Sequence, residues 1–455
     1  MDEWQSDLRD VLADRISTSE SDRAQHGRDP GHPDAPAPEA VAYPVDTDEV
    51  VALVRICATH GKAVIPYGAG SSLEQQVSAP RGGLCIDLSR MAAVLEVNAE
   101  DMDVRVQAGV TREQLNAELR DTGLFFPIDP GANATIGGMA STRASGTNAV
   151  RYGTMRSNVL GLTVVTPEGD VVRTGSRARK SSAGYDLTAL FVGAEGTLGI
   201  ITEVALKLHP QPERVVAAVV AMPSLADAVD AVVLMLQYGL PLARMELLDE
   251  VQMRASIAFS KLQLPATPTL FVEFHGAPNA VAEQIERVEE IVREFGAELE
   301  WADAPEERSR LWRARHDAYW AAMALRPGAR MMTTDVCVPI SRLTECITAT
   351  RADFDARGLV APILGHVGDG NFHSFILYDG ADEREVRSAR EANDALVARA
   401  LAMGGTCTGE HGVGVGKQAF LAAEHASGVP VMGRLKRALD PGSLMNPGKI
   451  LHADL

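Results

Sequence analysis

The chain has 455 residues, of which 46% are hydrophobic and 23% charged, and its formal net charge at pH 7 is −18. This composition is typical of a soluble globular protein, and the length indicates two or three domains rather than one core. The negative charge argues against a nucleic-acid partner, because a phosphate backbone is bound by a face rich in Lys and Arg. It does not exclude a small anionic substrate, since a few cations decide the charge of a pocket.

The sequence shows no targeting or membrane segment. The N-terminus starts with Asp2 and Glu3 and lacks the basic and apolar regions of a signal peptide. No window approaches the ~18 uninterrupted apolar residues of a transmembrane helix. The five cysteines are widely spaced and form no CxxC pair, as expected for reduced thiols. We therefore expect a cytoplasmic protein, and we leave peripheral attachment at the inner membrane open.

An α+β domain is expected over residues 37–213, after a helical lead-in and a Pro/Ala-rich arm at 1–36. Its first helix should begin near Asp46 and end at Gly61, and a buried strand should follow at 63–65. Further along the chain, a capping box at 111–114 predicts the start of a helix. A β-hairpin is predicted at 162–174 and a strand at 199–208.

Strands alternate with long helices after residue 213. Strands are predicted at 215–221, 268–275 and 333–338 and on both sides of Gly370. Helices are predicted at 224–237, 279–295 and 306–325. This alternation favours an open antiparallel sheet with helices on one face. We assign residues 214–425 to this second domain and expect residues 426–455 to pack back on the first.

Glycine-rich segments indicate that the backbone approaches a ligand. Ile65-Pro66-Tyr67-Gly68-Ala69-Gly70-Ser71-Ser72 follows a strand, so its N–H groups and hydroxyls can surround a diphosphate. Taken alone it could equally be a plain tight turn, and Leu73 at the sixth position breaks the dinucleotide fingerprint. The longer tract 129–146 has almost no bulky side chain and could hardly fill a core. It favours a flat, phosphate-bearing cofactor, and 193–201 again joins glycines to a strand.

Histidines and a carboxylate lie on glycine-rich turns in the second half. His366 and His373 flank a Gly-Asp-Gly-Asn turn, so two flanking strands would let both imidazoles converge on one point. Glu410 and His411 lie between Gly409 and Gly412. Two imidazoles and one carboxylate with open positions form the ligand set of a catalytic Zn, Mn or Fe site. A structural role is the alternative for each histidine taken singly.

The three glycine-rich segments, in this order and spacing, resemble the FAD-binding domain of the vanillyl-alcohol-oxidase/PCMH flavoprotein superfamily, which has two subdomains. The resemblance implies that the first segment holds the pyrophosphate, the second lies along the flavin and ribityl chain, and the third meets the adenosine. Members with covalent flavin usually carry a His near the first segment, where Ser71 and Ser72 stand here, so non-covalent FAD is expected. The implied FAD contacts are Pro66, Tyr67, Gly68, Ala69, Gly70, Ser71, Ser72, Pro130, Gly131, Ala132, Thr135, Gly137, Gly138, Ser141, Ala144, Gly146, Tyr152, Glu195, Gly196 and Ile200.

The second half resembles the FAD-linked oxidase C-terminal domain, a substrate domain built on an antiparallel sheet with helices. The resemblance rests on both histidines and on the motifs at 311–316, 333–339, 404–412 and 444–449. It is strongest to the mitochondrial-type D-lactate dehydrogenase (cytochrome) family and covers nearly the whole chain after about residue 38. The family implies oxidation of a small D-2-hydroxy acid by hydride transfer to flavin N5. Because no nicotinamide fingerprint is present, a cytochrome, a quinone or an electron-transfer flavoprotein is the expected electron acceptor.

This chemistry gives each candidate residue a role. A metal bound by His366, His373 and Glu410 would lower the pKa of the substrate hydroxyl. His411 is the candidate general base, because imidazole titrates near working pH. Arg315 is the candidate clamp for the substrate carboxylate, with a salt bridge on the helix surface as the alternative. Trp312, Tyr319 and Trp320 favour a buried face there, and Asn446 matches a family residue near the flavin, with a turn cap as its alternative.

The substrate is expected to be D-lactate or a slightly larger aliphatic 2-hydroxy acid. The related hydroxyglutarate branch has an Asn where this chain has Phe375, and a Lys-Tyr-Asp where it has Thr333-Thr334-Asp335. Without those polar groups a second carboxylate is costly to bury. The alternatives are a D-2-hydroxyglutarate dehydrogenase, the FAD subunit of a glycolate oxidase complex and, in another class, a metal-dependent hydrolase with a nucleotide-binding domain. The metal, the acceptor and the oligomeric state, with a homodimer as one option, stay open.

Overall fold

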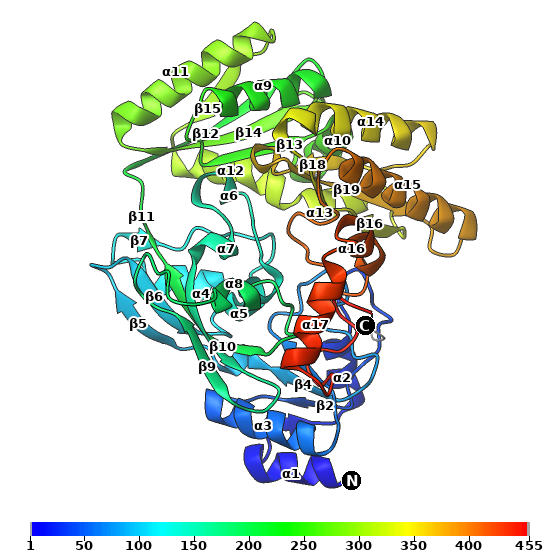
Figure 1. Cartoon of the computed structure of the whole chain (residues 1–455). Helices are drawn as coiled ribbons and strands as arrows, with labels where there is room; N and C mark the ends of the chain where they lie inside the picture. Colours follow the sequence, from blue (N-terminus) through cyan, green and yellow to red (C-terminus); the bar gives the residue numbers. More distant parts are fainter. Residues whose placement is uncertain (1, 453–455) are drawn as a thin grey trace. The chain divides into compact units, whose positions relative to one another are not determined.

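The computed structural model describes residues 2–452, without the side chain of Ala314, so the outermost residues of both predicted terminal segments lie outside it. The chain divides into two compact units, and Figure 1 traces its course. Unit 1 comprises Met1–Ser145, Gly153–Gln211 and Glu410–Leu455, and unit 2 comprises Gly146–Tyr152 and Pro212–Gly409. The division after Gln211 lies close to the expected boundary at 213. The return to unit 1 comes at Glu410, earlier than the expected 426, and the short segment 146–152 joins unit 2.

The first sheet of unit 1 has four strands in the order β1-β2-β4-β3, where β2 and β3 both run parallel to β4. Their bounds are Ile16–Ser17, Ala40–Ala42, Leu84–Asp87 and Val64–Tyr67. Helix α3 (Thr47–Thr59) packs against α1 (Glu3–Leu12) beside this sheet, and α2 spans Glu20–Gly27. The predicted helix is confirmed, because Asp46 caps α3 by accepting from Glu49 N at 2.9 Å.

The second sheet of unit 1 is antiparallel, with the order β5-β6-β10-β8-β9. Its strands are Val94–Asn98, Asp103–Gln107, Ile200–Lys207, Val159–Val165 and Val171–Gly175, so the predicted hairpin and the strand after it are confirmed. The smaller elements are α4 (Arg112–Glu118), α5 (Ile136–Thr142), α7 (Met155–Asn158), α8 (Leu187–Phe191) and the pair β7 (Leu124–Phe125) and β11 (His209–Pro210).

The capping box at the start of α4 is half correct. Thr111 Oγ1 accepts from Gln114 N at 3.2 Å, as predicted. The side chain of Gln114 does not return to the cap, because its Nε2 donates to the carbonyl of Ala92 at 2.8 Å. A tertiary hydrogen bond has therefore replaced the reciprocal half of the motif.

The C-terminal segment adds to the edge of the first sheet. Helices α16 (Gln418–Glu424) and α17 (Val429–Leu439) precede it. Val64 N then donates to Leu444 O at 2.9 Å, and Asn446 N donates to Val64 O at 2.8 Å. These two bonds hold Asn446 beside β3, directly before the first glycine-rich loop.

Unit 2 is built on one antiparallel sheet with the strand order β15-β12-β14-β13-β18-β19-β16, and β17 pairs with β19. From β12 to β19 the strands are Arg214–Ala221, Arg244–Leu248, Thr269–Gly276, Leu299–Ala302, Arg330–Thr333, Val336–Cys337, Ile363–Gly365 and Asn371–Tyr378. The helices are α6 (Ala149–Tyr152), α9 (Leu225–Gln237), α10 (Glu250–Ser260), α11 (Pro278–Glu294), α12 (Pro305–His316), α13 (Ala318–Ala324), α14 (Leu343–Ala356) and α15 (Glu383–Ala402). The predicted antiparallel sheet is confirmed.

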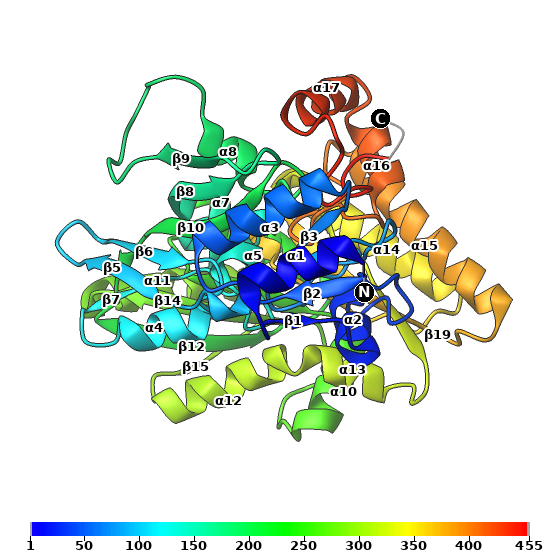
Figure 2. The same ribbon diagram turned by 90° about the horizontal axis from the view of Figure 1, so that it is seen from below.

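Helices cover both faces of this sheet, so the expectation of one covered face is wrong. Strand β14 is buried without interruption from Thr269 to His275, which requires cover on either side. Figure 1 and Figure 2 show α11 and α12 on opposite sides of the strands. The predicted helix over 306–325 is broken at Asp317 into α12 and α13, and the predicted strand over 333–338 is divided into β16 and β17. No helix within residues 2–452 is long and apolar enough to cross a membrane.

Candidate active site

Two histidines of unit 2 face each other across the turn between β18 and β19. The turn needs Gly370, whose φ is +78° and where a Cβ would lie 2.2 Å from the carbonyl oxygen of Val338. The rings of His366 and His373 stand nearly perpendicular, with their centroids 5.5 Å apart. A nitrogen of one ring lies within 4.8 Å of a nitrogen of the other. The structure thus brings together the two histidines that the sequence proposed as metal ligands.

Each of these imidazoles is oriented through its Nδ1 atom. Nδ1 of His366 lies 2.6 Å from Oε1 of Glu246, and Nδ1 of His373 lies 3.2 Å from the carbonyl oxygen of Thr334. A carbonyl and an ionised carboxylate only accept, so both Nδ1 atoms carry the proton in the neutral rings. The lone pair of each neutral ring is then on Nε2, which is the arrangement of metal-binding histidines.

Glu246 is the central acid of unit 2, and the sequence did not reveal it. Its side chain is 0% exposed, and its second oxygen, Oε2, accepts from Nε of Arg315 at 2.7 Å. Burial raises the pKa of this carboxyl, but its electrostatic interactions and hydrogen bonds with His366 and Arg315 together outweigh burial and leave the pKa below its ordinary value. The only sequence signal was a glutamate within the apolar run Met245 to Leu248, which lies on the unpredicted strand β13.

Arg315 lies in the last turn of α12 and is 13% exposed. Its partner is the buried Glu246, so it does not form the surface salt bridge that was the alternative for this residue. The guanidinium has five N–H donors, and Glu246 takes the one at Nε. Trp312, one turn earlier, is buried as expected, whereas Trp320 is 63% exposed and was wrongly assigned to the buried face.

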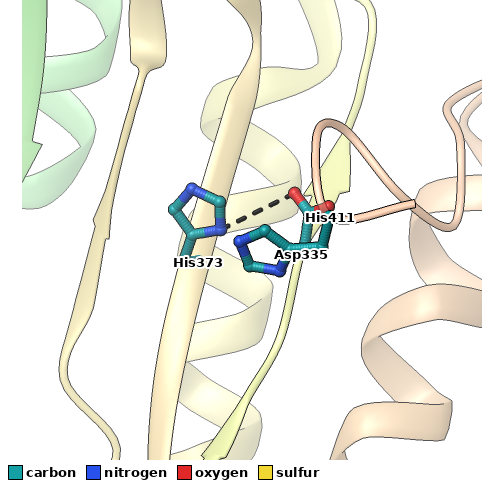
Figure 3. Close-up of side chains that lie close together, drawn as sticks. All are labelled: Asp335, His373 and His411. Atoms are coloured by element: carbon teal, nitrogen blue, oxygen red, sulfur yellow. Dashed lines mark ion pairs between the residues drawn. The ribbon is translucent and has the colours of Figure 1, made fainter. Parts of the chain in front are cut away.

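Asp335 is a second buried acid that the sequence did not single out. Figure 3 shows its carboxylate beside His373, and its Oδ1 lies 3.6 Å from Nδ1 of that ring. Oδ1 also accepts from Asn371 Nδ2 at 2.7 Å. Oδ2 accepts from Thr408 Oγ1 and from Gly409 N, both at 2.9 Å. Asp335 therefore joins a candidate metal ligand to the last two residues of unit 2.

Glu410 and His411 begin the last segment of unit 1 and follow Gly409 directly along the chain. Both side chains are partly buried. The carbonyl oxygen of His411 accepts from Gln76 Nε2 at 2.8 Å. Gln76 follows the first glycine-rich segment, so unit 1 fixes the backbone of the candidate base against its predicted cofactor loops.

The three predicted FAD segments converge within unit 1. Glu195 N donates to Ser141 O at 2.8 Å, which joins the third segment to the second. A Cβ on Gly68 would lie 2.2 Å from Thr135 Oγ1, and one on Gly196 would lie 2.3 Å from Pro66 Cγ. The first segment therefore packs closely on both of the others, at positions where only glycine fits.

Two buried polar atoms of unit 1 fit a bound FAD. Ser72 Oγ and Asn446 Oδ1 have no hydrogen-bond partner among the described residues. Buried polar atoms are almost always hydrogen-bonded, so a polar ligand is the expected partner of both. Asn446 Nδ2 donates to the carbonyls of Gln76 and Glu195, at 3.0 and 2.8 Å, and these bonds fix the direction of its amide.

Three of the predicted FAD contacts are placed differently from the rest. Gly146 and Tyr152 belong to unit 2, where the Tyr152 hydroxyl lies 2.7 Å from His275 Nδ1. The carboxylate of Glu195 accepts from the backbone N–H groups of Val413 and Gly414. That role was not predicted, because it depends on a contact with a segment more than two hundred positions later in the chain.

Comparisons with known proteins agree with this geometry. The FAD binding domain family matches residues 38–175, and the family of FAD linked oxidases, C-terminal domain, matches residues 211–450. The chain is 51% identical to "Probable D-lactate dehydrogenase, mitochondrial" of Danio rerio, over 98% of this chain and 91% of the relative. It is 44% identical to "D-lactate dehydrogenase (cytochrome), mitochondrial" of Arabidopsis thaliana, over 98% of this chain and 79% of the relative.

More distant proteins share the same architecture. The chain is 33% identical to "Glycolate oxidase subunit GlcD" of Bacillus subtilis, over 92% of this chain and 90% of the relative. Among solved structures, substrate-bound p-cresol methylhydroxylase matches 100% of this chain and 97% of its own with a TM-score of 0.81. The sequence identity to that structure is 18%, so this likeness shows the fold alone.

The fold, the converging glycine-rich loops and the family matches define an FAD-dependent oxidoreductase of the FAD-linked oxidases. Within them, the chain belongs to the mitochondrial-type D-lactate dehydrogenase (cytochrome) family. The expectations of FAD and of a PCMH-type fold are thereby confirmed, and the metal-dependent hydrolase is set aside.

Proposed function

We propose that this enzyme oxidises D-lactate or a similarly small D-2-hydroxy acid to the 2-oxo acid, with the assistance of a divalent metal. The observation that carries the proposal is the buried acid Glu246, which orients His366 on one side and Arg315 on the other. The carboxylate of Glu246 thus links an imidazole oriented as a metal ligand to a guanidinium that could bind the substrate carboxylate. The names of the relatives support the substrate class.

The candidate donor set His366, His373 and Glu410 fits a Zn, Mn or Fe ion. His366 and His373 would each offer Nε2, and Glu410 would complete two imidazoles and one carboxylate. A bound metal of this kind would lower the pKa of the substrate hydroxyl as a Lewis acid. Glu246 and Thr334 accept at the opposite nitrogens, and such partners make ligating histidines more basic and fix their direction.

The protein would bind and orient the substrate through Arg315 and remove its hydroxyl proton through His411. Nε of Arg315 is held by Glu246, so the plane of the guanidinium is set before a carboxylate binds to the remaining donors. Nε2 or Nδ1 of His411 would take the hydroxyl proton. A bound FAD would supply the hydride acceptor for this oxidation. The electron acceptor is proposed to be a cytochrome, as the name of the Arabidopsis relative suggests.

Phe375 supports a substrate without a second carboxylate. Residues two apart in a strand point to the same face, so Phe375 lies on the His373 side of β19. It is 7% exposed, pairs across the strands with Thr333 and meets Tyr319 edge to face at 5.9 Å. The apolar ring of Phe375 itself offers a distal carboxylate no hydrogen-bond donor, which would make burial of the carboxylate against it costly.

Steady-state kinetics with an artificial electron acceptor would test the substrate. We expect the highest kcat/KM with D-lactate or D-2-hydroxybutyrate, compared with glycolate and D-2-hydroxyglutarate. A highest value with D-2-hydroxyglutarate would contradict the role given to Phe375. If the purified chain turned over none of the four, the likeness to a glycolate oxidase subunit would instead favour action within a complex.

A further inference from the structure

Two buried carboxylates hold the backbone on either side of Glu410 and His411. In unit 2, Asp335 binds the two residues that precede this dipeptide. In unit 1, Glu195 binds the second and third residues that follow it. Neither acid belongs to the ligand, base or clamp set proposed above, although the side chains of Asp335, His373 and His411 also lie close enough together to form a second candidate metal group. Both acids accept from main-chain N–H groups, Asp335 from Gly409 and Glu195 from Val413 and Gly414.

Asp335 fixes the direction in which the chain enters Glu410. Its Oδ2 accepts from Gly409 N and from Thr408 Oγ1, so one oxygen orients consecutive residues. Its Oδ1 is held by Asn371 Nδ2 at 2.7 Å, which prevents the carboxylate from rotating. The same Oδ1 lies 3.6 Å from Nδ1 of His373. A dashed line marks this pair in Figure 3. The carboxylate that binds Gly409 therefore lies directly beside His373.

Glu195 fixes the backbone after His411. Oε1 accepts from Val413 N at 2.6 Å and Oε2 from Gly414 N at 2.8 Å. Gly412 has a φ of +78°, and a Cβ there would lie 2.6 Å from Glu195 Oε1. The segment therefore packs against the carboxylate so closely that no side chain fits between them.

We propose that Asp335 and Glu195 are positioning residues that set the direction of the Glu410 and His411 side chains. The proposal rests on the proposed function, which gives that dipeptide its metal and proton roles. Glycines at 409, 412 and 414 leave the backbone free to turn, so two external anchors are needed to hold reactive groups within the tolerance that catalysis requires.

Asparagine and glutamine variants would test the proposal in the FAD-loaded enzyme. Asp335→Asn and Glu195→Gln replace one accepting oxygen by an N–H donor that faces N–H or O–H donors. We expect kcat per bound flavin to fall about 10- to 100-fold, with less change in KM and full flavin content. Assays at pH 8 are preferred, because burial raises the pKa of Glu195 to about 7 even though the N–H groups of Val413 and Gly414 lower it.

Metal affinity gives Asp335 a readout that is independent of turnover. After chelation, Mn²⁺ would be titrated into the FAD-loaded enzyme without substrate and free Mn²⁺ followed by EPR. We expect Asp335→Asn to weaken Mn²⁺ binding about 10-fold or more. Asp249→Asn is the matched control, because Asp249 is equally buried in unit 2 and accepts from Gln252 N at 2.7 Å to cap α10. The Asp249→Asn variant should have a lower melting temperature but unchanged Mn²⁺ binding and kcat.

Three results would overturn the proposal. One is a lower melting temperature for Asp335→Asn or Glu195→Gln with unchanged kcat per flavin, which would leave these acids purely structural. Another is loss of FAD from Glu195→Gln, which would return this residue to cofactor binding. The third is wild-type Mn²⁺ affinity in Asp335→Asn. If that variant did not fold, Thr408→Val, which removes one bond to Asp335, should show a smaller fall in kcat, and no fall would contradict us.

The proposed function has its own separate test in His411→Ala. If this variant reduced its flavin with D-lactate at the wild-type rate, the base assignment would fail. The Mn²⁺ titration of Asp335→Asn would still report on positioning, because it needs no substrate and no base.

Discussion

Nδ1 of His366 and Oε1 of Glu246 are 2.6 Å apart in the interior of unit 2, and the same carboxylate binds Arg315 through its other oxygen. The candidate metal-ligating histidine and the candidate substrate-binding arginine thus share one hydrogen-bond acceptor, the carboxylate of Glu246. Neither can move without disturbing the other, so metal binding and carboxylate binding are expected to be coupled through Glu246.

Glu246→Gln should therefore damage both functions. The glutamine removes the charge from a buried ionic group, and breaking such a group typically costs about 3–5 kcal/mol. We expect a lower melting temperature, about 10- to 100-fold weaker Mn²⁺ binding and a higher KM for D-lactate. Thermal unfolding, Mn²⁺ titration and steady-state kinetics would measure the three effects.

Glu273→Gln is the matched control for this variant. Glu273 lies on the neighbouring strand β14 and is also a buried acid between a histidine and an arginine, His275 at 2.8 Å and Arg244 at 3.5 Å. Its loss should destabilise the protein without weakening Mn²⁺ binding. Equal weakening by both variants would mean that the effect of Glu246 is only one of folding.

Phe375→Asn combined with Thr333→Lys should shift the substrate preference. The new amide and ammonium groups would supply partners for a distal carboxylate at paired positions of β19 and β16. We expect the ratio of kcat/KM for D-2-hydroxyglutarate over D-lactate to rise at least about 10-fold. Phe271→Leu, from the same apolar cluster, should lower stability and leave the ratio unchanged. An unchanged ratio in the double variant would show that this corner does not face the substrate.

Acid should destabilise unit 1 through His209. Burial and the nearby cations Lys207 and Arg179 lower the pKa of this imidazole from 6.5 to about 4. The unfolded chain then binds a proton that the folded chain does not, so stability present above pH 6.5 is lost as the pH falls toward 4. We expect His209→Gln to lose less stability than the wild type between pH 7.5 and pH 5, measured by urea unfolding.

His26→Gln provides a comparison of opposite sign. Burial lowers the pKa of His26, but hydrogen bonds to Asp87 and Asp22 raise it by more, and the net shift is upward. Its contribution to stability is full below pH 6.5 and is lost as the pH rises through its folded pKa. The variant should lose more stability than the wild type on acidification, and the same sign for both variants would contradict these assignments.

Ser72→Ala should weaken FAD binding. Ser72 Oγ, in the first glycine-rich segment, is buried without a partner among the described residues. A single neutral hydrogen bond contributes about 0.5–1.5 kcal/mol, so we expect the Kd for FAD to rise about 2- to 10-fold. Ser78→Ala is the control, because Ser78 Oγ donates to Gln75 O at 2.9 Å. Fluorescence titration of the apoprotein with FAD would measure both, and an unchanged Kd for Ser72→Ala would remove it from the site.

Local patterns were sufficient for much of the fold. The helix after Asp46 could be predicted because its cap and its buried stripe of Val50, Leu53, Val54 and Cys57 are all encoded within one segment. The histidine pair could be predicted for the same reason, since one short turn separates two strands. Helices α10, α14 and α15 and strands β13 and β15 were not predicted, and β13 carries Glu246.

The supporting acids could not be predicted from local patterns. Glu246 reaches His366 only because β13 pairs with β18, as in the register Leu247 to Gly365. Asp335 reaches Gly409, and Glu195 reaches Val413, through contacts between distant segments. Glu246 stands in an apolar run, and although Glu195 and Asp335 lie within motifs that the sequence analysis named, nothing in those motifs indicates these contacts. The role of each acid follows from strand pairing or from contacts between segments far apart in the chain, which a single sequence does not show.

The most direct test of the central claim is anaerobic reduction of the bound flavin by D-lactate, followed by its absorbance before and after chelation. We expect rapid reduction of the untreated enzyme, a loss of at least about 100-fold in rate after removal of the metal, and recovery when Zn²⁺ or Mn²⁺ is added back. L-lactate should reduce the flavin far more slowly throughout. Reduction at an unchanged rate after complete removal of the metal would contradict the metal-assisted mechanism built on His366, His373 and Glu410.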